Sequence, residues 1–182
     1  MLTKNIKDAL KIGCYWGRFN PPHKGHMQVI KKLIKKVDKL IIAIGRSEIK
    51  NTKKDPFSGK ERTLMFREYL KEEKINIKRI KIVNIIEGKS YSESVRRFVN
   101  TCPKFDVLFL SDEKNTLCKY FKDKSKIQRF PRSEGGISAT KIRDAIAKNK
   151  PWGNLTGESV VKIIKKINGI NRIKKAYKLN NN

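Results

Sequence analysis

Short apolar runs alternate with amphipathic segments along most of this chain. Ile12–Trp16 and Leu40–Ile44 are continuous apolar runs, which are typical of strands buried on both faces of a parallel sheet. Between them lies a segment with helical spacing of its apolar positions, residues 24–37: Met27, Ile30, Leu33, Ile34 and Val37. The pattern therefore predicts a strand, a helix and a second strand in this order.

The same alternation continues beyond the second strand. Further strands are expected at residues 81–86, 105–110 and 127–130, and further helices at 58–70, 92–102, 115–122 and 140–148. Ser58 and Glu61 have the spacing of a capping box, and Ser138, after the turn residues Gly135 and Gly136, can cap the later helix. Two final helices are expected at 158–167 and 171–177, after a break at Trp152-Gly153.

Alternating strands and helices predict an α/β fold with a Rossmann-like, doubly wound parallel sheet. In such sheets, ligands bind beyond the carboxyl ends of the strands. We assign residues 1–150 to the Rossmann-like domain and residues 151–182 to a small C-terminal helical extension of the same domain.

The chain is strongly basic. It has 44 Lys and Arg residues against 17 Asp and Glu, a formal net charge of +27. Such an excess favours anionic partners, but lysines spread along the whole chain equally fit a compositional bias that decorates solvated faces. No recognised RNA- or DNA-binding signature accompanies the charge, so nucleic acid is not expected as the main partner.

Three cysteines, Cys14, Cys102 and Cys118, form no CxxC pair, which argues against a disulfide framework or a zinc site. No apolar stretch reaches the roughly 18–20 residues of a membrane span. Residues 1–9 lack the apolar core of a signal peptide. We therefore expect a cytoplasmic protein with no membrane segment and no metal ligands of its own.

Both histidines of the chain, His23 and His26, lie in one run, GRFNPPHKGH, at residues 17–26. The run follows the first predicted strand and opens the first predicted helix. Helix N-termini carry unpaired N–H groups and partial positive charge, and they bind phosphate readily. The run lacks the GxxxxGK[ST] and GxGxxG patterns. It therefore predicts a phosphate site that is neither a P-loop nor a dinucleotide-binding turn.

A second run, ISATKIR at residues 137–143, also lies at the start of a predicted helix and is also suited to bind phosphate. The hydroxyls of Ser138 and Thr140 at a helix start can bind phosphate oxygens together with backbone N–H groups. Arg143, one turn further on, can add a charge-assisted contact.

Together the two runs resemble the signatures of the nucleotidylyltransferase superfamily, HxGH after Gly-x-Phe-x-Pro and ISxTxxR. Segments 55–62 and 152–173 extend the similarity to the archaeal-type nicotinamide mononucleotide (NMN) adenylyltransferases, over about residues 11–175. The resemblance implies in-line adenylyl transfer from ATP to NMN without a covalent intermediate, giving NAD and pyrophosphate. It also implies Mg²⁺ as the cofactor bound with ATP, and a homo-oligomer, trimer or hexamer.

Residue roles follow from the same resemblance. It implies catalytic contacts to the ATP phosphates by four residues: His23, His26, Arg18 and Arg143. It implies ATP binding by a second set: Gly17, Phe19, Lys24, Gly25, Lys54, Ser138 and Thr140. Lys54 stands where many members carry arginine, so the charge is kept and the bidentate geometry is lost.

The residues at the positions where family members bind the acceptor nucleotide depart from the family pattern. Glu48 stands where glutamine is usual, and Ser94 aligns with a family tryptophan that stacks on the nicotinamide. Tyr91 can stand in for this ring if the helix shifts by about one turn. The expected acceptor-binding residues are Trp16, Glu48, Glu87, Tyr91 and Ser94. These departures leave open nicotinic acid mononucleotide, or a different phosphorylated acceptor such as FMN or pantetheine phosphate.

Overall fold

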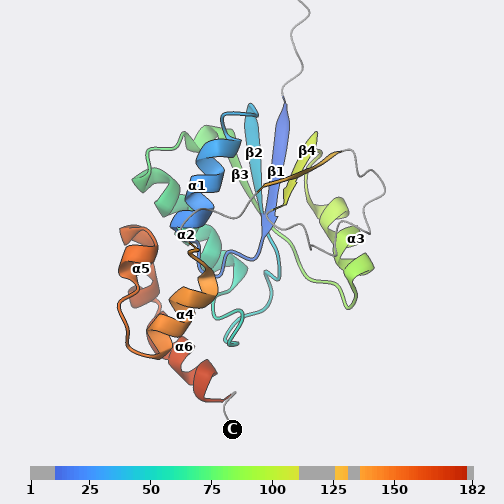
Figure 1. The fold of residues 1–182 in the computed structure, drawn as a ribbon. Helices are drawn as coiled ribbons and strands as arrows, with labels where there is room; N and C mark the ends of the chain where they lie inside the picture. The colour runs from blue at the N-terminus through green and yellow to red at the C-terminus, as the bar shows by residue number, and fades with distance from the viewer. Residues whose placement is uncertain (1–10, 111–125, 131–135, 180–182) are drawn as a thin grey trace, which may run out of the picture.

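A five-stranded parallel sheet forms the centre of the computed structural model, which describes residues 11–110, 126–130 and 136–179 (Figure 1). Its strand order is β3-β2-β1-β4-β5, and each neighbouring pair is parallel. The strands are β1 (Ile12–Gly17), β2 (Lys39–Ile44), β3 (Ile80–Asn84), β4 (Val107–Leu110) and β5 (Ile127–Arg129).

Helices cover both faces of the sheet. They are α1 (Lys24–Leu33), α2 (Gly59–Glu72), α3 (Tyr91–Thr101), α4 (Ala139–Ala147), α5 (Glu158–Lys166) and α6 (Gly169–Lys178), with short 3₁₀ turns at Ile77–Arg79 and Gly153–Leu155. In Figure 1, α1, α2 and the three C-terminal helices lie on one side of the sheet and α3 lies on the other. The predicted doubly wound Rossmann-like fold is confirmed.

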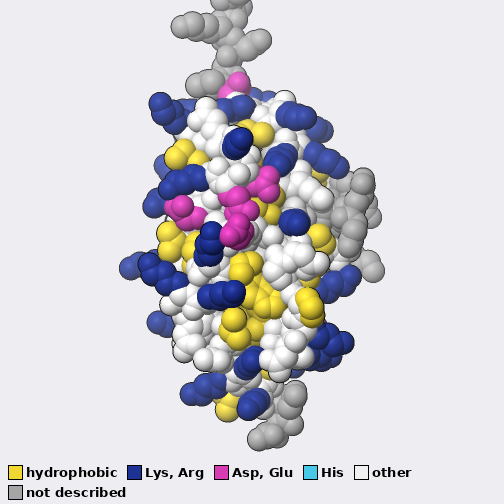
Figure 2. Space-filling model, turned by 90° about the vertical axis from the view of Figure 1, so that its left-hand side faces the viewer, with side chains coloured by type: hydrophobic (Ala, Val, Ile, Leu, Met, Phe, Trp, Pro, Cys, Tyr) yellow, Lys and Arg dark blue, Asp and Glu magenta, His cyan; other side chains and the backbone are white. Residues whose placement is uncertain are grey.

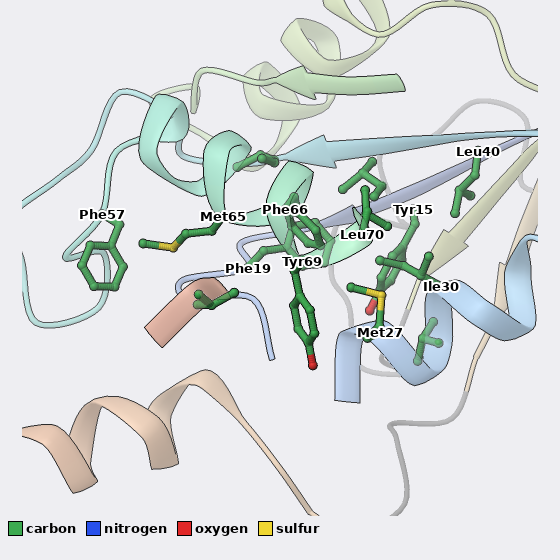
Figure 3. Close-up of a cluster of buried hydrophobic side chains, with 14 of the residues drawn as sticks. Tyr15, Phe19, Met27, Ile30, Leu40, Phe57, Met65, Phe66, Tyr69 and Leu70 are labelled. Atoms are coloured by element: carbon green, nitrogen blue, oxygen red, sulfur yellow. The ribbon is translucent and has the colours of Figure 1, made fainter. Parts of the chain in front are cut away.

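Alternate residues of the strands enter two separate cores, which explains why the strand sequences are continuously apolar. Tyr15 and Leu40 pack with Phe66 of α2 and other side chains in the larger core (Figure 3). Their neighbours Cys14 and Ile41 belong to the smaller core under α3.

The topology defines where a ligand is expected. The chain runs outward from β1 through β2 to β3 and then returns to β4, which pairs with the other edge of β1. The strand order therefore reverses beside β1, and the loop after Gly17 begins at this reversal. Open α/β sheets bind ligands at such a switch point.

Several element ends differ from the sequence prediction. Helix α1 ends at Leu33 rather than at Val37, because the chain turns so that Asp38 N donates to Lys11 O at 2.8 Å on its way into β2. Val37 still enters the core from this turn and is 5% exposed, so the apolar periodicity outlasts the helix. The helix expected at residues 115–122 lies outside the described residues.

Helix α6 begins at Gly169, two residues before its predicted start. A Cβ at this position would lie 2.7 Å from Cε1 of Phe57 and 2.9 Å from the carbonyl oxygen of Ile164. The glycine therefore permits close packing of α6 rather than breaking the helix. The predicted capping box of Ser58 and Glu61 at the start of α2 is confirmed.

The surface reflects the composition. Lys and Arg side chains are spread over the face in Figure 2, whereas Asp and Glu are fewer on it and several of them lie close together near its middle. None of the helices in the described part of the chain has the length and apolar character needed to cross a membrane. The division of the chain after residue 150 stays a prediction.

Candidate functional site

A cavity of about 310 Å³ lies beyond the carboxyl end of β1, between the N-termini of α1 and α4. It brings together most of the residues predicted to act on ATP. These are Gly17, Arg18, Phe19, His23, Gly25, His26, Lys54, Ser138, Thr140 and Arg143. The sequence runs at 17–26 and 137–143 are thus neighbours in space.

Lys24 is the exception among the residues predicted to bind ATP. Its exposed side chain borders a different hollow, shared with Tyr69 and Glu72. The structure therefore does not place Lys24 in the cavity.

The loop after β1 is folded around one aromatic ring. Phe19 has a left-handed backbone, with φ at +53°, and its buried ring makes edge contacts with Tyr15, His26 and Phe66. A Cβ on Gly17 would lie 2.7 Å from this ring. Glycine is needed here because the loop folds back so closely, and the fold-back sets the path of the chain into α1.

The two histidines are coupled at the start of α1. The backbone N–H of His23, the N-cap residue, donates to Nδ1 of His26 at 3.2 Å, and the ring centroids lie 3.6 Å apart. Because Nδ1 of His26 is an acceptor, its neutral ring carries the proton on Nε2. The arrangement fixes His26 as an Nε2–H donor.

Burial keeps both imidazoles neutral. It lowers the pKa of His23 to about 4 and holds the pKa of His26 well below its usual range, with repulsion from His23 adding to the second effect. Nδ1 of His23 is buried and has no hydrogen-bond partner within the described residues. Buried polar atoms rarely stay unpaired, so this nitrogen is available for a hydrogen bond with a bound ligand.

Arg143 reaches the cavity from α4. Ser138 caps this helix by accepting a hydrogen bond from Lys141 N at 3.2 Å. The Nη1 of buried Arg143 donates to Asn20 O at 2.8 Å, and Nη2 donates to Thr140 Oγ1 at 3.1 Å. Its Nε is also buried without a partner in the part of the chain that the structure describes.

The electrostatics of the cavity favour an anion. Two helix N-termini meet there, Gly25 and His26 from α1 and Ser138 and Thr140 from α4. Three cations, Arg18, Lys54 and Arg143, line it, and its described lining contains no Asp or Glu. Helix N-termini and clustered cations both stabilise phosphate groups.

Asn20 was not singled out from the sequence, although it fixes the cavity. Its buried amide donates to Phe57 O at 3.0 Å and accepts from Phe57 N at 3.2 Å. These bonds tie the loop after β1 to the segment that carries Lys54. Only its place inside the GRFNPPHKGH run could have drawn attention to it.

Arg62 is a second residue that the sequence analysis missed. It is fully buried in α2 and donates to the carbonyl oxygens of Arg18, Gly45 and Arg46, which follow β1 and β2, and to Ser58 O. Burial lowers its pKa to about 10, so it stays charged at neutral pH. A charged residue in the polar stretch 55–62 gives no sequence signal of burial.

The C-terminal segment also supports the site. Oγ1 of buried Thr156 donates to the carbonyl oxygen of Pro22 at 2.8 Å, directly before His23. The predicted C-terminal extension is therefore bonded to the histidine loop.

The residues predicted to bind the acceptor lie outside this cavity. The carboxylate of Glu48 accepts from Glu87 N at 3.1 and 3.3 Å, and Glu87 pairs with Arg46. Trp16 stacks on Phe98 of α3, with ring centroids 4.2 Å apart. The structure thus brings Glu48 and Glu87 together and places Trp16 under α3.

Ser94 has a local role in this arrangement. Its buried hydroxyl accepts from Gly88 N at 2.9 Å and donates to Ser90 O at 2.9 Å, which fastens the loop before α3. Tyr91, the first residue of α3, is 59% exposed. Binding of an acceptor by these residues stays a prediction.

The chain is similar in sequence to known proteins. The Cytidylyltransferase-like family matches residues 14–145. The chain is 34% identical to a nicotinamide-nucleotide adenylyltransferase of Pyrobaculum arsenaticum over 90% of its length and 93% of that protein. It is 32% identical to the protein of the same name from Thermoplasma acidophilum, over 96% and 94% of the two chains.

Solved structures share the fold. A bifunctional NMN adenylyltransferase/ADP ribose pyrophosphatase from Francisella tularensis, complexed with AMP and a manganese ion, superposes with a TM-score of 0.74 at 18% identity. The match covers 95% of this chain and 53% of that longer one. A putative nicotinate-nucleotide adenylyltransferase from Vibrio parahaemolyticus superposes with a TM-score of 0.60 at 17% identity, over 90% and 96% of the two chains.

Proposed function

The chain belongs to the nicotinamide-nucleotide adenylyltransferases of the Cytidylyltransferase-like family, and we propose that its cavity binds the ATP triphosphate for adenylyl transfer to NMN. The observation that carries this proposal is the meeting of two helix N-termini, two neutral imidazoles and three cations in one cavity. Such a set stabilises several phosphate groups in a row, as a nucleoside triphosphate presents them.

The reaction needs no protein nucleophile. The 5′-phosphate of NMN attacks the α-phosphorus of ATP in line, a new P–O bond forms, and pyrophosphate leaves with the electron pair of the broken bond. Rate enhancement then comes from positioning the reactants and from stabilising developing negative charge.

Five cavity residues have a proposed part in this step. Nε2–H of His26 donates to oxygens that gain charge at the α-phosphate, and His23 adds a neighbouring donor. Arg18, Lys54 and Arg143 hold the leaving β- and γ-phosphates. Neutral histidines suit this task because they donate hydrogen bonds without losing a proton to phosphate.

A divalent cation, Mg²⁺, is proposed to enter with ATP. The described residues contain no group of three or more His, Cys, Asp or Glu side chains able to hold a metal. Mg²⁺ is usually held by substrate phosphates and one or two carboxylates rather than by a dedicated protein cage. We therefore propose that the triphosphate carries the cation, which would neutralise phosphate charge.

The proposal is tested by pyrophosphate release from ATP and Mg²⁺ with four acceptors in parallel: NMN, nicotinic acid mononucleotide, FMN and pantetheine phosphate. We expect release with NMN and formation of NAD. His26→Asn should lose most of this activity, whereas Gln28→Ala, an exposed change on the same helix outside the cavity, should retain it.

Other outcomes contradict particular parts of the proposal. Release with FMN or pantetheine phosphate alone would contradict NMN as the acceptor and leave the phosphate site in place. ATP turnover unchanged by His26→Asn would contradict the assigned site.

The oligomeric state is a separate proposal. From the family resemblance we propose a homo-oligomer, trimer or hexamer, and sedimentation velocity measures its mass directly.

A further inference from the structure

Two cysteines lie against each other on the face of the sheet away from the ATP cavity. The sulfurs of Cys14, in β1, and Cys102, the C-cap residue directly after α3, are 3.6 Å apart and share a hydrogen bond. Neither residue lines the cavity assigned to ATP. The proposed reaction makes no use of this thiol pair.

We propose that Cys14 and Cys102 are a site of reversible oxidation, at which a peroxide converts the two thiols into a disulfide. A disulfide requires sulfurs about 2.05 Å apart, so the atoms must approach by roughly 1.5 Å. Cys102 follows the last helical turn, and its extended backbone (φ −75°, ψ 131°) lies outside the regular helix. A small shift at this helix end can therefore close the gap.

The surroundings distinguish the two thiols. Cys102 is 7% exposed and borders a hollow that is separate from the ATP cavity, together with Val95, Phe105 and Leu108. Cys14 is fully buried. A small oxidant therefore reaches Cys102 first, and Cys14 is positioned as the second thiol.

Electrostatics favour the same order. The hydrogen bond from Cys14 lowers the pKa of Cys102, and Lys81 adds to this effect. Lys81 lies on the same sheet face, since Cys14 pairs with Ile41 and Ile41 pairs with Lys81. Burial raises the pKa of Cys14. The thiolate is the reactive form, so Cys102 is the nucleophile.

The chemistry balances in two steps. The sulfur of Cys102 attacks one oxygen of hydrogen peroxide, the O–O bond breaks, and sulfenic acid and water form. The thiol of Cys14 then attacks this sulfur, an S–S bond forms, and a second water leaves. Two thiols are oxidised by two electrons while one peroxide is reduced. The disulfide links β1 to α3, which the Trp16–Phe98 stack already holds together.

The test uses full-length Cys118→Ser, because this chain retains only the pair as thiols. We expect limited peroxide under native conditions to remove both titratable thiols and lower the mass by two hydrogen atoms. A Cys14–Cys102 linked peptide should appear and disappear again with dithiothreitol. The midpoint of thermal unfolding should rise after oxidation, because the link constrains the unfolded chain.

Two variants in the same background test the order of reaction. Cys14→Ser, which keeps a hydrogen-bond donor beside Cys102, should leave Cys102 as a sulfenic acid that dimedone labels, whereas Cys102→Ala should leave Cys14 unreactive. Two intact thiols after peroxide treatment, or sulfinic acid at Cys102 without a disulfide, would overturn the proposal. These readouts are independent of ATP turnover, and native circular dichroism shows that each variant is folded.

Discussion

Arg172 of α6 and Glu61 of α2 form an ion pair across 111 positions of sequence, with Nη1 2.5 Å from Oε1. The same guanidinium donates to Pro56 O at 2.6 Å and to Asn51 Oδ1 at 2.9 Å. Both acceptors flank the segment that presents Lys54 to the cavity. The last described helix therefore anchors a loop of the proposed ATP site.

Replacing this anchor should affect both stability and ATP binding. We expect Arg172→Ala to lower the free energy of unfolding by about 1–3 kcal/mol, because Glu61 and Pro56 O lose a charged donor. The KM for ATP should rise, because the Lys54 loop is less firmly held. Lys175→Ala, an exposed change on the same helix, is the control. Urea unfolding and initial rates measure the two effects, and an Arg172→Ala protein matching the control in both would refute the anchoring role.

The tautomer of His26 predicts different effects for two amide substitutions. Asparagine places an oxygen near Nδ1 and preserves the bond from His23 N, whereas glutamine can place an N–H near the Nε2 position. We expect His26→Asn to fold normally but lose turnover by about 10²–10³-fold, the usual effect of removing a donor to developing charge. His26→Gln should retain more activity than His26→Asn. Turnover measured at saturating ATP decides this, and the reverse order would contradict the assigned donor.

Burial of His23 makes stability depend on pH. Its pKa is about 4 in the folded protein and about 6.5 in the unfolded chain. Between these values the unfolded chain binds the additional proton, so the stabilisation is complete above pH 6.5 and is lost as the pH falls towards 4. From pH 7 to pH 5, His23 alone should account for about 2 kcal/mol of this loss.

Urea unfolding of the wild type and of His23→Gln, each at pH 7 and pH 5, measures the contribution of His23 to this loss of stability. The variant should show a smaller decrease, because its side chain does not titrate. Equal pH dependence of the two proteins would show that His23 is not buried in a neutral state. The pKa of His26 is lowered mainly by burial, which acts in the same direction in both proteins.

Glu72 supplies the cap that the sequence of α5 lacks. The N-cap residue of α5 is Gly157, and the Glu72 carboxylate accepts from Glu158 N and Ser159 N, each at 2.9 Å. Glu72→Ala should cost about 1 kcal/mol, the typical loss for a removed cap. Glu72→Gln, which retains an acceptor oxygen, should cost less. Thermal unfolding compares the variants, and an equal loss in both would exclude capping as the cause.

The sequence could predict the elements that depend on local pattern. Continuous apolar runs identified β1 and β2, and the spacing of Ser58 and Glu61 identified the start of α2, because burial on both faces and helix capping have short-range signatures. The two runs predicted to bind phosphate were also visible, since each of them leads into the start of a helix.

Sequence alone determined the alternating α/β order, the basic composition and the residue types of the proposed ATP site. Only the tertiary structure decided that Arg62 is buried among backbone carbonyls, that Arg172 reaches Glu61, that Lys24 lies outside the cavity and that Cys14 contacts Cys102. Local pattern reports which face of an element is apolar. The partners of a polar side chain depend on contacts between segments distant in sequence, and these exist only once the sheet has brought the segments together.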